Sequence, residues 1–144
     1  MMIETSLKKQ HEETLKKNPN DADAWHALGI LAAQDHDHDS ALTSVNKAIL
    51  LKPDQAHFYN SLGNILLRLK QFDKATQAFQ TAIQIDNHYA TAYNNLGNVY
   101  YQTNQWMLAK NAYEKAIVLK KEYFFKSKKT SWIKKRTRKQ QIEN

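Results

Sequence analysis

Apolar residues recur along this chain with the spacing of an α-helix. The whole pattern then repeats at a longer, constant interval, which is the distance from Gly29 to Gly63 and again from Gly63 to Gly97. Between residues 93 and 100 the apolar positions follow i, i+3, i+4, i+7, which is one stripe of an α-helix. The stripe occurs in three copies, which are Tyr93, Leu96, Gly97 and Tyr100; Tyr59, Leu62, Gly63 and Leu66; and Trp25, Leu28, Gly29 and Ala32. A fixed period of this length predicts a repeat protein whose units stack on their neighbours.

A second helical stripe follows each first one after a short polar turn. Its copies are Ala109, Tyr113, Ala116 and Ile117; Ala75, Phe79, Ala82 and Ile83; and Ala41, Val45, Ala48 and Ile49. Each period therefore predicts a pair of antiparallel helices. The three pairs occupy residues 22–55, 56–89 and 90–123.

All three glycines of the chain lie at the same place in the period, at Gly29, Gly63 and Gly97. A Gly inside a helix costs about 1 kcal/mol relative to Ala. Three glycines in register indicate that a backbone approaches closely there. The paired alanines of the second stripe indicate an equally close approach on the facing helix.

The two ends of the chain depart from the period. Residues 1–21 predict a half-repeat, one helix closed by Pro19, which lies one full period before Pro53. No proline stands at Lys121, so the last helix can run on into residues 124–144, a basic tail that is either partly helical or disordered. A capping helix is expected after residue 123. His38 replaces the Phe72 and Trp106 of the other repeats, which predicts looser packing in repeat one.

These positions resemble the tetratricopeptide repeat (TPR) family, whose pattern is an aromatic, Leu-Gly, a large residue, then Ala, aromatic, Ala and Pro. The copies here are Trp25-Leu28-Gly29-Ala32-Ala41-Val45-Ala48-Pro53, Tyr59-Leu62-Gly63-Leu66-Ala75-Phe79-Ala82-Asn87, and Tyr93-Leu96-Gly97-Tyr100-Ala109-Tyr113-Ala116-Lys121. The resemblance implies an all-α, right-handed superhelix segment of about seven helices. It also implies a role in protein–protein interaction, with the first helices lining a concave groove.

The groove-facing side of the first helices is rich in amides. Asparagine is a poor residue inside a helix, and its amide matches the alternating N–H and C=O groups of an extended peptide. We therefore expect a peptide-binding groove, and solvated asparagines with no ligand are the alternative. The groove residues are His26, His57, Asn60, Asn64, Arg68, Asn94, Asn95, Asn98, Tyr101 and Gln102.

Two subclasses of the family give contrasting expectations for this groove. One grips the C-terminal carboxylate of chaperone peptides with lysines and an arginine, but His26, Asn60 and Asn94 stand where a lysine is needed. The asparagines look more similar to the superhelix of O-GlcNAc transferases. The resemblance implies an asparagine just before the Leu of each repeat. Asn95 occupies this position in the third repeat, whereas Ala27 and Ser61 occupy it in the first and second.

The basic character of the chain belongs to its last residues. The net charge is +7, but residues 1–119 carry 11 Lys/Arg against 12 Asp/Glu, and residues 120–144 carry 10 against 2. Trp132 precedes the cluster Lys134, Lys135, Arg136, Arg138 and Lys139. Such a tail can bind nucleic acid or an anionic surface or act as a nuclear import signal. A solvated, disordered end is the simplest interpretation.

Other function classes find little support. The chain has no cysteine, which fits a reducing, cytoplasmic setting, and it has neither a secretory signal nor a membrane-spanning stretch. No catalytic constellation or phosphate-binding glycine loop occurs, so we expect neither an enzyme nor a cofactor. The run from Asp35 to Asp39 alternates Asp and His at a turn, where consecutive residues do not converge as metal ligands do, so no metal site is expected.

The expected partner is a protein or peptide held in the groove. The chain begins and ends off the repeat, so it can also be a fragment of a larger TPR-containing protein with a catalytic domain elsewhere. Exposed end faces of the stack would favour self-association into a homo-oligomer.

Overall fold

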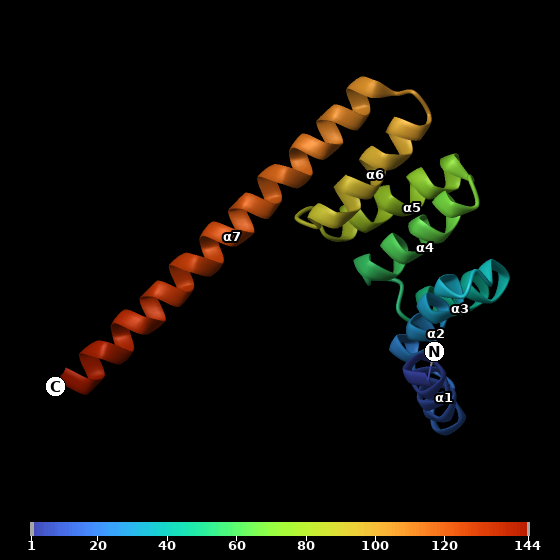
Figure 1. Cartoon of the computed structure of the whole chain (residues 1–144), viewed down its shortest axis with the longest axis horizontal. Helices are drawn as coiled ribbons and strands as arrows, with labels where there is room; N and C mark the ends of the chain where they lie inside the picture. The colour runs from blue at the N-terminus through green and yellow to red at the C-terminus, as the bar shows by residue number, and fades with distance from the viewer. Residues whose placement is uncertain (1, 144) are drawn as a thin grey trace.

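The computed structural model describes residues 2–143, and within them the chain forms seven α-helices and no strand. The helices are α1 (Met2–Lys17), α2 (Ala22–Gln34), α3 (His38–Leu51), α4 (Ala56–Arg68), α5 (Phe72–Ile85), α6 (Ala90–Gln102) and α7 (Trp106–Glu143). They stack as successive hairpins, and α7 projects from the stack as a long rod (Figure 1). The all-α solenoid of about seven helices is confirmed. Met1 and Asn144 lie outside the described residues.

The turn inside each hairpin repeats one backbone geometry. His36, Lys70 and Asn104 occupy the same place in successive repeats, and all have a positive φ, of 60°, 57° and 60°. In the middle turn the N–H of Gln71 bonds to the carbonyl of Leu66 at 2.9 Å. This is the Schellman ending of a helix, which places one residue in the left-handed region. It reverses the chain so that α5 returns along α4.

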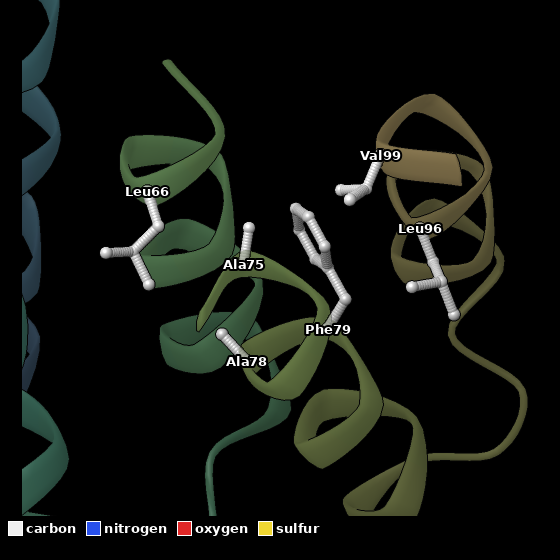
Figure 2. Close-up of a cluster of buried hydrophobic side chains, with 6 residues drawn as sticks. All are labelled: Leu66, Ala75, Ala78, Phe79, Leu96 and Val99. Atoms are coloured by element: carbon white, nitrogen blue, oxygen red, sulfur yellow. The ribbon is translucent and has the colours of Figure 1, made fainter. Parts of the chain in front are cut away.

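Each glycine of the first helices lies beneath a large side chain of the second. A Cβ added to Gly63 would stand 2.5 Å from the ring of Phe79, and one added to Gly29 would stand 2.5 Å from a methyl of Val45. The close approach expected at these glycines is therefore found, but its main partner is a side chain rather than a backbone. Figure 2 shows the ring of Phe79 directed from α5 toward Val99 on α6.

The first helices are buried on a second side that the sequence patterns did not include. Phe58 and Ile65 of α4 are 0% and 2% exposed, and they pack against α3, where Ala48 and Val45 are buried. The sequence does contain a sign of this second buried side. Ile65 and Val99 are aliphatic residues at equivalent positions of consecutive repeats, and both are buried. Two buried sides are what a helix needs when it lies between two hairpins.

The two ends of the stack differ from its middle. No residue of α1 is buried. At the other end α7 continues through the tail to Glu143, as the absence of a proline permits, so no separate capping helix forms within the described residues. Ile117, expected in the apolar stripe, is 52% exposed because no further helix covers it.

His38 is the first residue of α3 and occupies the place of Phe72 and Trp106 in the other repeats. Its side chain is half-buried, and its Nδ1 atom is buried without a hydrogen-bond partner in the described part of the chain. A buried polar atom without a partner costs free energy. The looser packing expected of repeat one stays a prediction, since Ala41, Val45 and Ala48 of α3 are all 0% exposed.

Candidate functional site

The predicted groove residues come from α2, α4 and α6, and they differ in how far they are open. His57, Arg68, Tyr101 and Gln102 are exposed, and Asn60 is 7% exposed. The others, which are His26, Asn64, Asn94, Asn95 and Asn98, are half-buried. The face is therefore a mixture of open positions and positions enclosed between neighbouring helices.

Two polar contacts join consecutive first helices across the repeats. A ring nitrogen of His26 on α2 lies 2.8 Å from the hydroxyl of Ser61 on α4. One repeat further on, Asn95 of α6 donates to the amide oxygen of Asn60 over 3.0 Å. Both pairs are separated by 35 residues, so they are equivalent rungs of one ladder. The amides of Asn60 and Asn95 thus connect helices to each other, a structural role that the sequence patterns did not reveal.

Two more of the predicted residues have partners inside the protein. The hydroxyl of Tyr113 donates to the amide oxygen of Asn98 at 2.7 Å. The guanidinium of Arg68 donates to the backbone carbonyl of Ala33 at 3.1 Å, near the end of α2. Arg68 therefore adds a second hydrogen bond to this carbonyl, which also accepts from the N–H of His36, and its side chain is otherwise exposed to solvent.

The positions left open are His57, Asn64, Asn94, Tyr101 and Gln102. The amides of Asn64 and Asn94 form no side-chain hydrogen bond within residues 2–143. They can offer donors and acceptors to a ligand without breaking a contact of the fold. The ring of Tyr101 is 58% exposed and packs edge-on against Trp106.

A pair of histidines lies at the junction of repeats one and two. The ring centroids of His26 and His57 are 5.2 Å apart, and both rings pack against Phe58. Burial and then the charge of His57 lower the pKa of His26 from 6.5 to about 4, with Asp23 opposing. His26 is therefore neutral at physiological pH and takes part in the ladder as a neutral ring.

The run of Asp and His between α2 and α3 has a local structural role. The carboxylate of Asp37 accepts from the N–H of Ser40 at 3.2 Å and begins α3, and hydrogen bonding with Ser40 lowers the pKa of Asp37. His36 and His38 stack edge-on, with their rings 6.2 Å apart. Among the described residues, no three His, Asp or Glu side chains form a group suited to a metal ion.

The basic extension of α7 carries cations beside aromatic rings. The ammonium of Lys128 lies 4.6 Å from the ring centroid of Phe124, and the guanidinium of Arg136 lies 5.3 Å from that of Trp132. The side chains of Lys134, Lys135, Arg138 and Lys139 are exposed on the same extension. Among the described residues, no helix has the length and apolar character of a membrane span.

A hollow on the other side of the stack was not anticipated from the sequence. It measures about 490 Å³ and lies between second helices, lined by Leu42, Asn46, Lys74 and Gln77 among others. The one sequence signal for it is Leu42, which is aliphatic where the other repeats carry Thr76 and Lys110. Tyr59, Leu62 and Leu66 of α4 also line this hollow.

Comparison with known protein families decides what this arrangement is. Three family models match the chain: a TPR repeat over residues 63–104 and two tetratricopeptide repeats over residues 12–43 and 90–124. The chain is a tetratricopeptide repeat protein. No curated protein matches this TPR chain significantly.

Solved structures agree with the family. Two crystal structures of MamA superpose on the TPR chain with TM-scores of 0.71 and 0.70 and 30% identity, each over 78% of this chain. The matches span 66% and 62% of those MamA chains. A mutant of the O-GlcNAc transferase of Thermobaculum terrenum matches with TM-score 0.63 and 24% identity, over 65% of this chain and 18% of its own, which is a likeness of fold. The family match and the MamA structures support a general role as a protein-interaction scaffold.

Proposed function

We propose that the chain is a non-enzymatic, cytoplasmic scaffold that holds an extended peptide segment of a partner protein in the concave groove of α2, α4 and α6. The observation that carries the proposal is the pair of amides, Asn64 and Asn94, which face this side without partners in the described fold. An extended peptide offers N–H and C=O groups to both. Arg68 supplies a cation, and His57 and Tyr101 supply rings for side-chain contacts.

The hydrogen bonds between the first helices show which of the predicted groove residues have a structural role and which are left for a ligand. Asn60 and Asn95 hold the first helices together, so their loss would change the groove indirectly. Asn98 accepts from the hydroxyl of Tyr113, whereas Asn64 and Asn94 form no side-chain hydrogen bond within residues 2–143. They are the residues whose replacement tests the groove with the least effect on folding.

The test uses peptides selected from a random display library against the protein. The double variant Asn64→Ala and Asn94→Ala should abolish binding of groove-selected peptides while its melting temperature stays close to that of the wild type. Its matched control is Asn46→Ala and Asn111→Ala, which removes two exposed asparagines from second helices. Unchanged peptide binding by the groove variant would contradict the proposal.

The extension of α7 offers a second candidate function, binding of single-stranded nucleic acid. Its support is that aromatic rings and cations alternate on one helix, as in the pairs Phe124–Lys128 and Trp132–Arg136. Stacking and phosphate contacts use that combination. An oligonucleotide titration at increasing salt, with Trp132→Ala and a chain ending at Glu122, tests it. Binding that survives Trp132→Ala and vanishes near physiological salt would reduce it to nonspecific attraction.

A further inference from the structure

The stack of helices ends on a surface that no helix of the described residues covers. We call this surface the end face. It consists of Tyr101 from α6 and Trp106, Lys110, Tyr113 and Ile117 from α7. Tyr101, Trp106 and Ile117 are 58%, 57% and 52% exposed, respectively. Half-exposed aromatic and aliphatic side chains in one place mark a candidate interaction site.

The repeats themselves show what an end face of this kind accepts. Phe79 and Val45, one and two periods before Tyr113, are both 0% exposed, whereas Tyr113 is only half-buried. The difference arises because α4 covers α3 and α6 covers α5, while no helix within residues 2–143 covers the equivalent face of α7. The isoleucines show the same contrast, because Ile49 and Ile83 are half-buried at the covered junctions, whereas their equivalent Ile117 is exposed. Each covered face is therefore filled by an amphipathic first helix of the next repeat.

The polar ladder stops at the same place. His26 and Asn60 each reach the next first helix, through Ser61 and Asn95. Asn94 is the third residue at this position, and it forms no side-chain hydrogen bond among the described residues. A helix placed on the end face can complete this rung with a hydroxyl or amide.

The end face continues onto the basic extension of α7. Residues seven apart lie on one side of a helix. Phe124 therefore lies on the same side of α7 as Ile117, and Lys121, Lys128 and Lys135 lie beside them. The chain does not cover this side itself, because α7 runs straight away from the stack (Figure 1). A long cationic strip thus adjoins the apolar end face.

We propose that the end face binds an acidic amphipathic helix of a partner protein. The helix lies antiparallel to α7, as α6 lies antiparallel to α5. Its apolar stripe covers Trp106, Tyr113 and Ile117, and its N-terminal turns carry Asp or Glu beside Lys121 and Lys128. The strip of lysines selects a helix of this charge over a neutral or basic one. This site borders the concave groove at Tyr101 and Asn94, whereas Ile117 and Phe124 belong to the end face and its extension alone.

The probe is a peptide of residues 56–68, a first helix of this chain, extended at its N-terminus by about two turns of glutamate and alanine so that it is long enough to be helical. We expect saturable binding by fluorescence anisotropy. Ile117→Ser and Phe124→Ser should each weaken it about tenfold, because each removes a buried apolar side chain from the contact. A peptide with glutamine in place of glutamate should bind about tenfold more weakly at low salt.

Neighbouring residues provide matched controls. Val118 and Phe125 are 48% and 68% exposed but lie about 100° further round α7. Leu50, equivalent to Val118, is 75% exposed even at a covered junction. Val118→Ser and Phe125→Ser should leave binding unchanged. Equal weakening by these controls, or no saturable binding of the acidic peptide, would overturn the proposal. Concentration-dependent self-association that Ile117→Ser abolishes would also overturn it, since a second copy would then be the occupant.

Discussion

Asn95 on α6 donates its amide N–H to the amide oxygen of Asn60 on α4, over 3.0 Å and across 35 residues of sequence. His26 and Ser61 make the equivalent contact at the preceding junction, and Arg68 reaches the carbonyl of Ala33 with the same separation. The separation is one residue longer than the repeat period, so each contact joins a residue to the one that follows its equivalent in the next repeat. These contacts fix how the first helices line up along the groove.

Replacing Asn60 with Ala is therefore expected to destabilise the fold rather than affect only ligand binding. Asn60 is 7% exposed, and its loss leaves the amide of half-buried Asn95 without its acceptor. The expected cost is about 1–2 kcal/mol in the free energy of unfolding, measured by urea denaturation. Asn64→Ala, one turn along α4, is the control and should change it by less than about 0.5 kcal/mol. Equal effects of the two variants would contradict the ladder.

The sequence was sufficient for the helices, their pairing and the close approach at the glycines, because each follows from a spacing repeated in all three units, but it did not reveal that the glycines meet side chains. The roles of the asparagines were not predictable in the same way. The helical pattern of one repeat places Asn60 and Asn64 on the same broad face, but only the position of the next first helix decides that Asn60 is enclosed. For the same reason Ile117 matched the apolar stripe and yet is exposed, since burial depends on a neighbour that the last repeat lacks.

Gly63→Ala should be strongly destabilising. The added Cβ would stand 2.5 Å from the ring of Phe79, which is 0% exposed and cannot move aside. We expect a loss of about 2 kcal/mol in unfolding free energy, since overpacking outweighs the gain in helix propensity. Gly97→Ala meets Tyr113 at 2.7 Å, but that ring is only half-buried at the end of the stack and can shift. It should cost less, and a larger loss for Gly97→Ala would contradict this explanation.

Lys70→Gly should stabilise the protein. Lys70 has φ 57° in the turn between α4 and α5, a conformation that costs an L-residue about 1 kcal/mol and glycine almost nothing. Thermal denaturation should therefore show a higher melting temperature. Asn104→Gly tests the same geometry with a residue that tolerates it better, so its gain should be smaller. A lower melting temperature for Lys70→Gly would show that the lysine side chain contributes more than its backbone costs.

His38→Phe should stabilise repeat one. The change removes the buried Nδ1 atom that has no partner in the described fold and introduces the residue found at Phe72 in repeat two. The expected gain is about 1 kcal/mol in unfolding free energy. His36→Phe is the control, because His36 is exposed and has a positive φ that phenylalanine does not favour, so it should give no gain. Equal stabilisation by both would point to general hydrophobicity.

The half-buried ring of His26 makes stability depend on pH in a defined window. Its pKa falls from 6.5 in the unfolded chain to about 4 in the folded one, mainly because burial disfavours the charged ring. Between these values the unfolded chain binds a proton that the folded chain does not, so the free energy of unfolding decreases as the pH falls from 6.5 to about 4. We expect a decrease on the order of 1–2 kcal/mol after allowing for the partial solvent exposure of the ring. Urea denaturation at intervals across the window measures it. His26→Asn is the matched variant, since Asn60 and Asn94 occupy this position in the other repeats. It should flatten the dependence, and an unchanged slope would assign the effect to other histidines.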